Sequence, residues 1–155
     1  MDNDLRREVI LDNYNDPEYK GLVNDNSYLK VNQNSVSCID DLDFMVKIEN
    51  NKIIDIRFDG EACAISTSAS NIMSRLLIGK SIDEVKNILI NYKNMIEEKS
   101  YDEKVLEDLI VYDNISKQPN RINCALLPMK AVDKILGEVE NGKEIWVLFS
   151  WFKEI

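Results

Sequence analysis

The sequence contains no histidine, and this absence excludes several familiar kinds of catalytic and metal site. Triads with an imidazole base, zinc sites of the HExxH type and haem with an axial histidine all need that residue. A metal in this protein must therefore be held by cysteine, aspartate, glutamate or backbone groups. Cysteine is scarce too, with three residues in 155, and an odd number at wide spacing does not indicate a disulfide framework.

Positive charge is also in short supply, since 19 basic residues stand against 28 acidic ones and the net charge is −9. Nucleic-acid binding depends on neutralising phosphates with Lys and Arg, so we expect neither nucleic acid nor an anionic membrane as a partner. No apolar run approaches the ~18 residues of a membrane span, and the first residues lack the pattern of a signal peptide. We therefore expect a cytoplasmic protein with reduced thiols.

The periodicity of apolar residues predicts a single α+β domain over residues 1–155. Apolar and polar side chains alternate on both sides of Asn50-Asn51, which predicts an antiparallel hairpin. We expect a small antiparallel sheet of about three strands, covered by helices on one face. Helices are predicted at residues 4–14, 64–78, 81–97 and 101–111, with a last helix that ends at Gly137 and a strand or packing segment over the extension at 143–155.

Pro128 falls inside the last predicted helix. Proline lacks an amide N–H and its ring clashes with the preceding turn, so it disturbs a helix interior. We therefore expect that helix either to begin near Cys124 or to be kinked at the proline.

The three cysteines lie at predicted boundaries of elements. Cys38 precedes the hairpin, Cys63 lies at or just before a helix N-terminus, and Cys124 follows Arg121 by three residues. A helix N-terminus favours a negative group, so a thiolate at Cys63 would be stabilised. Arg121 would lie one helical turn from Cys124, where its positive charge would lower the pKa of that thiol.

Three thiolates need one more ligand for a tetrahedral site, and Asp40 is the best candidate. In an extended chain positions 38 and 40 face the same way. Zinc accepts both thiolate and carboxylate ligands, and one carboxylate would make an iron–sulfur cluster more labile. The residues alone leave an alternative open: cysteine is often a small buried hydrophobe, no CxxC pair is present, and Asp40 could be an ordinary turn residue.

Several stretches together resemble the IscU/SufU family of iron–sulfur cluster assembly proteins over about residues 5–137. They are the opening helix with VILDNY, the segment SCIDD around Cys38, DGEACAIS around Cys63, the Ser/Ala-rich helix that follows, and PNRINCALLP around Cys124. The resemblance implies that Cys38, Asp40, Cys63 and Cys124 bind zinc or a nascent iron–sulfur cluster. It also implies that a cysteine desulfurase supplies sulfur as a persulfide.

The chain is more similar to the SufU branch than to the IscU branch. Asn123 stands where the IscU branch has a histidine before the third cysteine, no LPPVK motif is present, and 61 residues separate Cys63 from Cys124. In that branch Cys38 would be the sulfur acceptor. Arg121, because of its charge near Cys124, is a candidate for thiolate support or docking. The family usually has glycine where this chain has Ile39 and Ala62, which reduces the backbone freedom there.

The sequence therefore predicts a zinc-binding sulfur acceptor that serves a cysteine desulfurase and passes sulfur to downstream iron–sulfur acceptor proteins. We expect such a partner rather than a self-sufficient enzyme. One alternative is a true scaffold that assembles a [2Fe–2S] cluster on the three cysteines. Another is a structural or regulatory zinc module without sulfur transfer.

Overall fold

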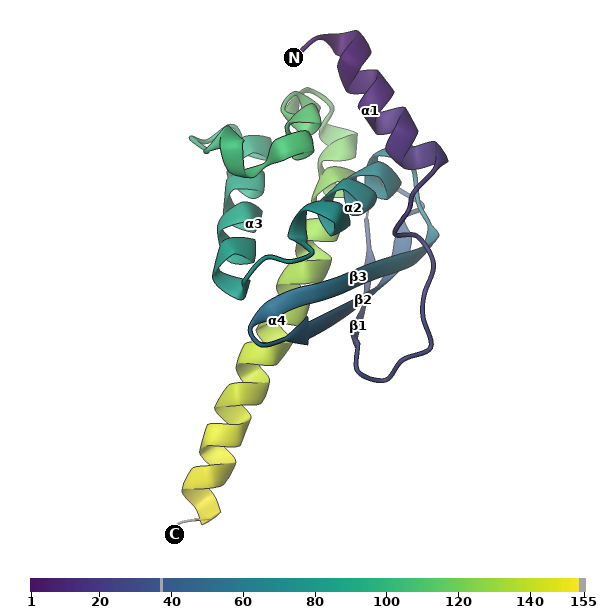
Figure 1. Ribbon diagram of the computed structural model, residues 1–155. Helices are drawn as coiled ribbons and strands as arrows, with labels where there is room; N and C mark the ends of the chain where they lie inside the picture. Colours follow the sequence, from purple (N-terminus) through teal and green to yellow (C-terminus); the bar gives the residue numbers. More distant parts are fainter. Residues whose placement is uncertain (37, 154–155) are drawn as a thin grey trace.

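The computed structural model of the chain describes residues 1–36 and 38–153, with side chains described as far as residue 139. Three antiparallel strands form one sheet in the order β1-β2-β3, with helices packed against it, as the sequence predicted (Figure 1). The elements are, in chain order, α1 (Asn3–Asn15), β1 (Leu29–Asn34), β2 (Asp41–Glu49), β3 (Lys52–Glu61), α2 (Ala64–Leu77), α3 (Ile82–Ile96), the 3₁₀ helices η1 (Glu103–Val105), η2 (Glu107–Tyr112) and η3 (Ile115–Lys117), and α4 (Pro119–Lys153).

Two asparagines connect β2 to β3 in a tight turn. Asn50 and Asn51 have φ values of 52° and 62°, the left-handed region that a two-residue hairpin turn of type I′ requires. Asparagine adopts that region more readily than most residues do. The hairpin places Asp41 opposite Glu61. The segment that precedes β2, with Cys38 and Asp40, is thereby brought beside the segment that follows β3.

An apolar face of the sheet packs on the helices. Leu42, Phe44 and Phe58 are at most 1% exposed, and the two phenyl rings stack with centroids 5.8 Å apart. Helix α4 contacts β1 and β2, α2 contacts β3, and the two helices contact each other (Figure 1). The starts of α2 and α4 are therefore fixed relative to the loop between β1 and β2.

The prediction of an α-helix at 101–111 is wrong. Residues 103–112 form two short 3₁₀ helices, and Glu107 at the junction has a φ of 46°, which an α-helix cannot contain. Leu106 and Leu109 are fully buried all the same. Their spacing of three residues suits a 3₁₀ turn as well as an α-helix, so the apolar pattern could not distinguish the two.

The last helix is longer at both ends than predicted. It begins at Pro119, where a missing N–H does no harm, and not near Cys124. It also continues through Gly137, whose φ is not positive, and so does not end there. Residues 143–153 are helical, so the prediction of a strand is wrong, and whether their side chains pack lies outside what the structure describes. That residues 1–155 form one domain stays a prediction.

A membrane-spanning helix must be both long and apolar. Within the described residues, no helix meets the two requirements together.

Gly60 provides a test of how closely β3 approaches Asp41 at the start of β2, the residue next to Asp40. Its φ is 134°, and a Cβ there would overlap the backbone carbonyl of Asp41. We expect Gly60→Ala to lower the free energy of unfolding by about 3 kcal/mol, or roughly 6–12 °C in Tm, from strain and overlap together. The measurement is thermal unfolding followed by circular dichroism.

Gly79→Ala is the matched control, because Gly79 also has a positive φ, of 89°, but a Cβ added there would meet no heavy atom within 4 Å. It should lower Tm by roughly a third as much, since only the backbone strain remains. Equal shifts for the two variants would show that the approach of Gly60 to Asp41 has no energetic consequence.

Candidate metal centre

Four potential ligands from distant parts of the chain meet at one point. One ligand atom from each of Cys38, Asp40, Cys63 and Cys124 lies within 4.8 Å of all the others. Cys38 and Asp40 come from the loop between β1 and β2, Cys63 lies between β3 and α2, and Cys124 lies in the second turn of α4. The structure thus brings together all four residues that the sequence singled out.

The size and chemistry of the cluster fit a tetrahedral metal. Zinc bonds of about 2.3 Å to sulfur and 2.0–2.2 Å to oxygen separate neighbouring ligand atoms by about 3.5–3.8 Å. Cys63 Sγ is already 3.8 Å from Asp40 Oδ2. Side-chain movements of about 1 Å would therefore complete the geometry. Three thiols with one carboxylate form a donor set that zinc and iron–sulfur clusters both accept.

Asp40 is buried, with 2% of its surface exposed, yet it is held as a carboxylate. The Cys63 N–H donates to its Oδ1 at 2.7 Å, and the Ser66 hydroxyl donates to its Oδ2 at 2.5 Å. Burial acts to raise the pKa of Asp40, but these hydrogen bonds outweigh burial, and the pKa lies below its ordinary value. The chain bends at residues 38–39, so the two ligands converge through a bend and not through the extended geometry that we expected.

Cys63 is the N-cap residue of α2, which agrees with the helix start predicted from the sequence. The backbone N–H of Ser66 lies 3.5 Å from the Cys63 sulfur. The unpaired N–H groups and the dipole at this end of the helix favour negative charge. A thiolate at Cys63, or an anionic metal complex that includes it, is therefore well placed.

Cys124 has no exposed surface, and burial raises the pKa of its thiol to about 12, with further contributions from Asp40 and Cys63. The contact with Arg121 acts to lower this pKa, as we expected, but desolvation and the nearby negative groups outweigh it. In the metal-free protein Cys124 is a neutral thiol at pH 7. A metal must displace its proton in order to bind there.

Arg121 contacts Cys38 as well as Cys124, the cysteine that the sequence suggested. Its guanidinium donates to the Cys38 sulfur at 3.6 Å. A hydrogen bond with Cys124, followed by the nearby charges of Cys63 and Cys38, raises the pKa of Arg121, so it stays a cation. A fixed positive charge therefore lies beside the Cys38 sulfur.

The loop around Cys38 is open to solvent. Cys38 itself is half-buried, and its neighbours Val36 and Ile39 are 96% and 73% exposed. Neither Ile39 nor Ala62 has a positive φ, so the conformation at these two positions does not require glycine. A second protein could therefore reach the Cys38 thiol, whereas Cys124 is closed off.

Ser66 is the residue that the sequence reasoning missed. It is the last residue of the DGEACAIS stretch, and its residue type alone indicates no role. Its position three residues after the N-cap Cys63 predicts a backbone contact with that cap, but the contact with Asp40 depends on the tertiary fold.

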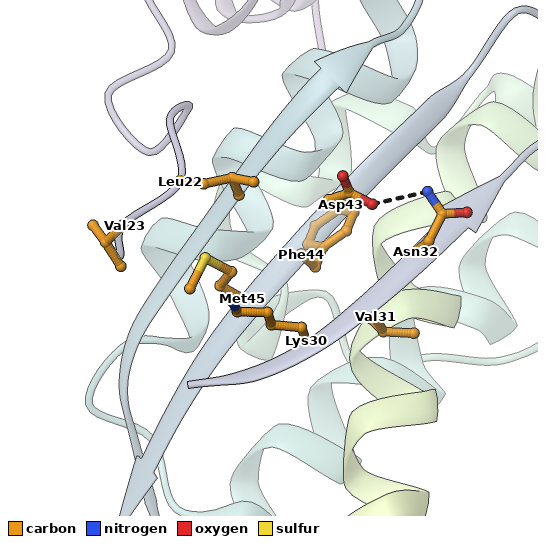
Figure 2. Close-up of a pocket in the computed structure, with 8 residues that line it drawn as sticks. All are labelled: Leu22, Val23, Lys30, Val31, Asn32, Asp43, Phe44 and Met45. Carbon is orange, nitrogen blue, oxygen red and sulfur yellow. Dashed lines mark hydrogen bonds between the residues drawn. The ribbon is translucent and has the colours of Figure 1, made fainter. Parts of the chain in front are cut away.

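A separate hollow lies on the sheet, away from the four ligands. It has a volume of about 350 Å³, and Figure 2 shows the Asn32 amide donating to Asp43 on its rim. No cysteine lines it, so it offers no second thiol site. Its lining residues are Leu22, Val23, Lys30, Val31, Asn32, Asp43, Phe44 and Met45.

Comparison with known proteins agrees with this geometry. The family described as "NifU-like N terminal domain" matches residues 5–125, which include all four ligands. The chain belongs to this family. The resemblance stated from the sequence is thereby confirmed, and the chain is a member of a family of iron–sulfur cluster assembly scaffolds. The end of α4 beyond residue 125 lies outside the matched range.

Named relatives of this NifU-like chain fall in both branches. "Zinc-dependent sulfurtransferase SufU" of Bacillus subtilis is 33% identical over 139 residues, which is 89% of this chain and 93% of that protein. "Iron-sulfur cluster assembly scaffold protein IscU" of Thermotoga maritima is 26% identical over 86% of this chain and 94% of that protein. A crystal structure described as a SUF-system scaffold protein from Fervidobacterium islandicum superposes with a TM-score of 0.75 at 31% identity, over 81% of this chain and 92% of that one.

Replacing Asp40 tests whether the carboxylate is a ligand. We expect Asp40→Ala to weaken zinc binding by at least about tenfold, because one charged donor of the four is lost. The measurement is competition with a zinc chelator of known affinity. Asp41→Ala is the matched control, since the Asp41 carboxylate accepts from the Asn32 amide at 2.7 Å and does not belong to the cluster. Unchanged zinc affinity in Asp40→Ala would show that Asp40 is not a ligand.

Proposed function

We propose that this protein is a zinc-binding sulfur acceptor in iron–sulfur cluster assembly. It takes persulfide sulfur from a cysteine desulfurase on Cys38 and passes it to downstream acceptor proteins in the cytoplasm. The observation that carries the proposal is the cluster of Cys38, Asp40, Cys63 and Cys124 within 4.8 Å, with one of its thiols on an open loop. The relative named as a zinc-dependent sulfurtransferase, 33% identical, supports it.

The proposed step is a thiol–persulfide exchange with no net redox change. The Cys38 thiolate attacks the outer sulfur of the persulfide on the desulfurase, and a new S–S bond forms at Cys38. The S–S bond on the desulfurase breaks, its electron pair stays with the desulfurase cysteine, and that thiolate takes up a proton. The outer sulfur leaves as a persulfide on Cys38.

The residues of the centre have separate tasks in this step. Zinc, when bound, keeps its thiol ligands deprotonated at neutral pH. The hydrogen bond from the Cys63 N–H holds Asp40 and Cys63 together. The side chain of Cys124, in α4, is fully buried. Arg121 supports the negative charge on Cys38 through its contact at 3.6 Å. Cys38 is therefore the ligand that can be released with the least disturbance of the rest.

A true scaffold for a [2Fe–2S] cluster is the second candidate. The same three thiols and one carboxylate could hold such a cluster, and the Thermotoga maritima relative carries the name of a scaffold. An oxygen ligand at Asp40 would keep that cluster releasable. A structural or regulatory zinc module is the third, and it would carry no sulfur at all.

Sulfur transfer distinguishes the three functions. We expect the protein, incubated with its own desulfurase and cysteine, to accelerate the desulfurase and to carry a persulfide on Cys38, because Cys38 lies on an open loop beside the Arg121 guanidinium. Mass spectrometry of the alkylated protein locates the persulfide. Cys38→Ser should abolish both signals, whereas Ser27→Ala, an exposed change remote from the thiols, should keep them.

Three outcomes would contradict the proposal. The absence of any persulfide or rate change in the unaltered protein would remove the sulfur acceptor and leave the scaffold or the zinc module. A persulfide confined to Cys63 would mean that the acceptor is wrong. Cluster absorbance after anaerobic addition of iron and sulfide, without sulfur transfer, would favour the scaffold.

Arg121 provides an independent test of the charge beside Cys38. A hydrogen bond to a charged group contributes about 1.5–3 kcal/mol, so Arg121→Ala should slow sulfur transfer roughly 10–100-fold while Tm changes little. Arg57→Ala is the control, because Arg57 pairs with Asp55 at 3.0 Å on the sheet, away from the thiols. A loss of Tm in Arg121→Ala that matches the loss of transfer would indicate a structural role.

A further inference from the structure

The carbonyl oxygen of Cys124 lacks the backbone donor that an α-helix normally supplies. In an α-helix this oxygen would accept from the N–H four residues later, and that residue is Pro128, which has none. Helix α4 continues on both sides, from Pro119 to Lys153. A buried carbonyl without a donor is costly, so another part of the protein must supply one.

Two hydroxyl groups from other helices lie against this part of α4. The Ser66 hydroxyl is 3.1 Å from the Cys124 oxygen, and the Tyr92 hydroxyl donates to the next carbonyl, that of Ala125, at 2.7 Å. Both side chains are fully buried. The turn that carries Cys124 is therefore tied to α2 and α3 at the point where Pro128 interrupts the hydrogen bonds of the helix.

Ser66 also contacts two of the other ligands. Its hydroxyl is 2.5 Å from Asp40 Oδ2, and its backbone N–H is 3.5 Å from the Cys63 sulfur. A hydroxyl has one proton, so it can donate either to the Asp40 carboxylate or to the Cys124 carbonyl at a given moment. The Ser66 hydroxyl thus has one acceptor on the segment of Asp40 and another on the segment of Cys124. These two segments must keep a fixed separation for a metal to bind.

We propose that Ser66 is a positioning residue for the metal centre, and that Pro128 creates the second of its two acceptors. The hydroxyl holds Asp40 in the metal-free protein and can move to the Cys124 carbonyl when a metal takes the carboxylate oxygen. When a metal holds the carboxylate oxygen, the Ser66 hydroxyl can donate to the Cys124 carbonyl, so both acceptors would be satisfied in the metal-bound state. This inference rests on the proposed function only in taking the cluster to be a metal site.

Metal affinity measures the proposed role directly. Loss of a side chain that orients metal ligands typically weakens binding 10–100-fold, and we expect Ser66→Ala to weaken zinc and cobalt binding by about that factor. The cobalt spectrum should also change, because its bands depend on the geometry of the four ligands. The probes are Co²⁺ added alone, followed by displacement with Zn²⁺ under anaerobic conditions.

Ser68→Ala is the matched control. Ser68 is also buried in α2, but its hydroxyl contacts the Ile65 carbonyl and the Tyr112 hydroxyl, not a ligand. It should lower Tm with metal affinity and cobalt spectrum unchanged. Equal effects of Ser66→Ala and Ser68→Ala on metal affinity would overturn the proposal.

A double-mutant cycle with Pro128→Ala tests the link to the proline. Alanine at 128 returns an N–H to the Cys124 carbonyl, so Ser66→Ala should weaken metal binding several-fold less in that background than in the natural one. Additive effects would show that Pro128 and Ser66 act independently and would overturn the link. If Ser66→Ala does not fold by itself, its effect on metal affinity is measured as the difference between Pro128→Ala and the double variant, where the carbonyl has a donor.

The outcomes separate this inference from the proposed function. No metal binding by the unaltered protein would remove the zinc-dependent function as well as the positioning role. Normal metal binding that is insensitive to Ser66→Ala would overturn the positioning role alone. Failure of Ser66→Ala to fold in both backgrounds, with Ser68→Ala folded, would also overturn it, because a structural role would then suffice.

Discussion

The buried carboxylate of Asp40 is the group on which the rest of the centre depends. Both of its oxygens accept hydrogen bonds from the start of α2, one from the Cys63 N–H and one from the Ser66 hydroxyl. A helix N-terminus supplies unpaired N–H groups and a favourable dipole for an anion. These contacts fix the loop before β2 against the first turn of α2. Two of the four ligands are therefore held near each other without a metal.

The three thiols share one chemistry but lie in three environments. Cys124 is fully buried and its thiol has a pKa of about 12, Cys63 caps a helix, and Cys38 lies on an open loop beside Arg121. Structural zinc sites are closed by four protein ligands, whereas sites that do chemistry keep one position open. Here Cys38 lies on an open loop, whereas Asp40 and Cys63 are tied to the start of α2 and Cys124 is buried, which suits a site that exchanges a ligand.

The sequence predicted those parts of the fold whose cause is local. The hairpin and the helix that begins after Cys63 follow from alternation, from turn residues and from a regular apolar stripe. The 3₁₀ segment at 103–112 was missed because the positive φ of Glu107 leaves no trace in apolar spacing. The four ligands were found through motifs, but the protonation of Cys124 and the contact of Arg121 with Cys38 depend on burial and on distant segments. Sequence spacing does not contain that information.

The departures from the family pattern fit the structure without strain. Ile39 and Ala62 stand where glycine is usual, and both have φ values that any residue can adopt. Replacing glycine at such a position restricts the unfolded chain more than the folded one, and so lowers the entropy lost on ordering. The loop with Cys38 should thus be more ordered before metal binds than a glycine loop would be. Ile39, 73% exposed, adds apolar surface beside the thiol that a partner must reach. The change from glycine to Ile39 therefore affects both the order of the loop that carries Cys38 and the apolar surface around its thiol.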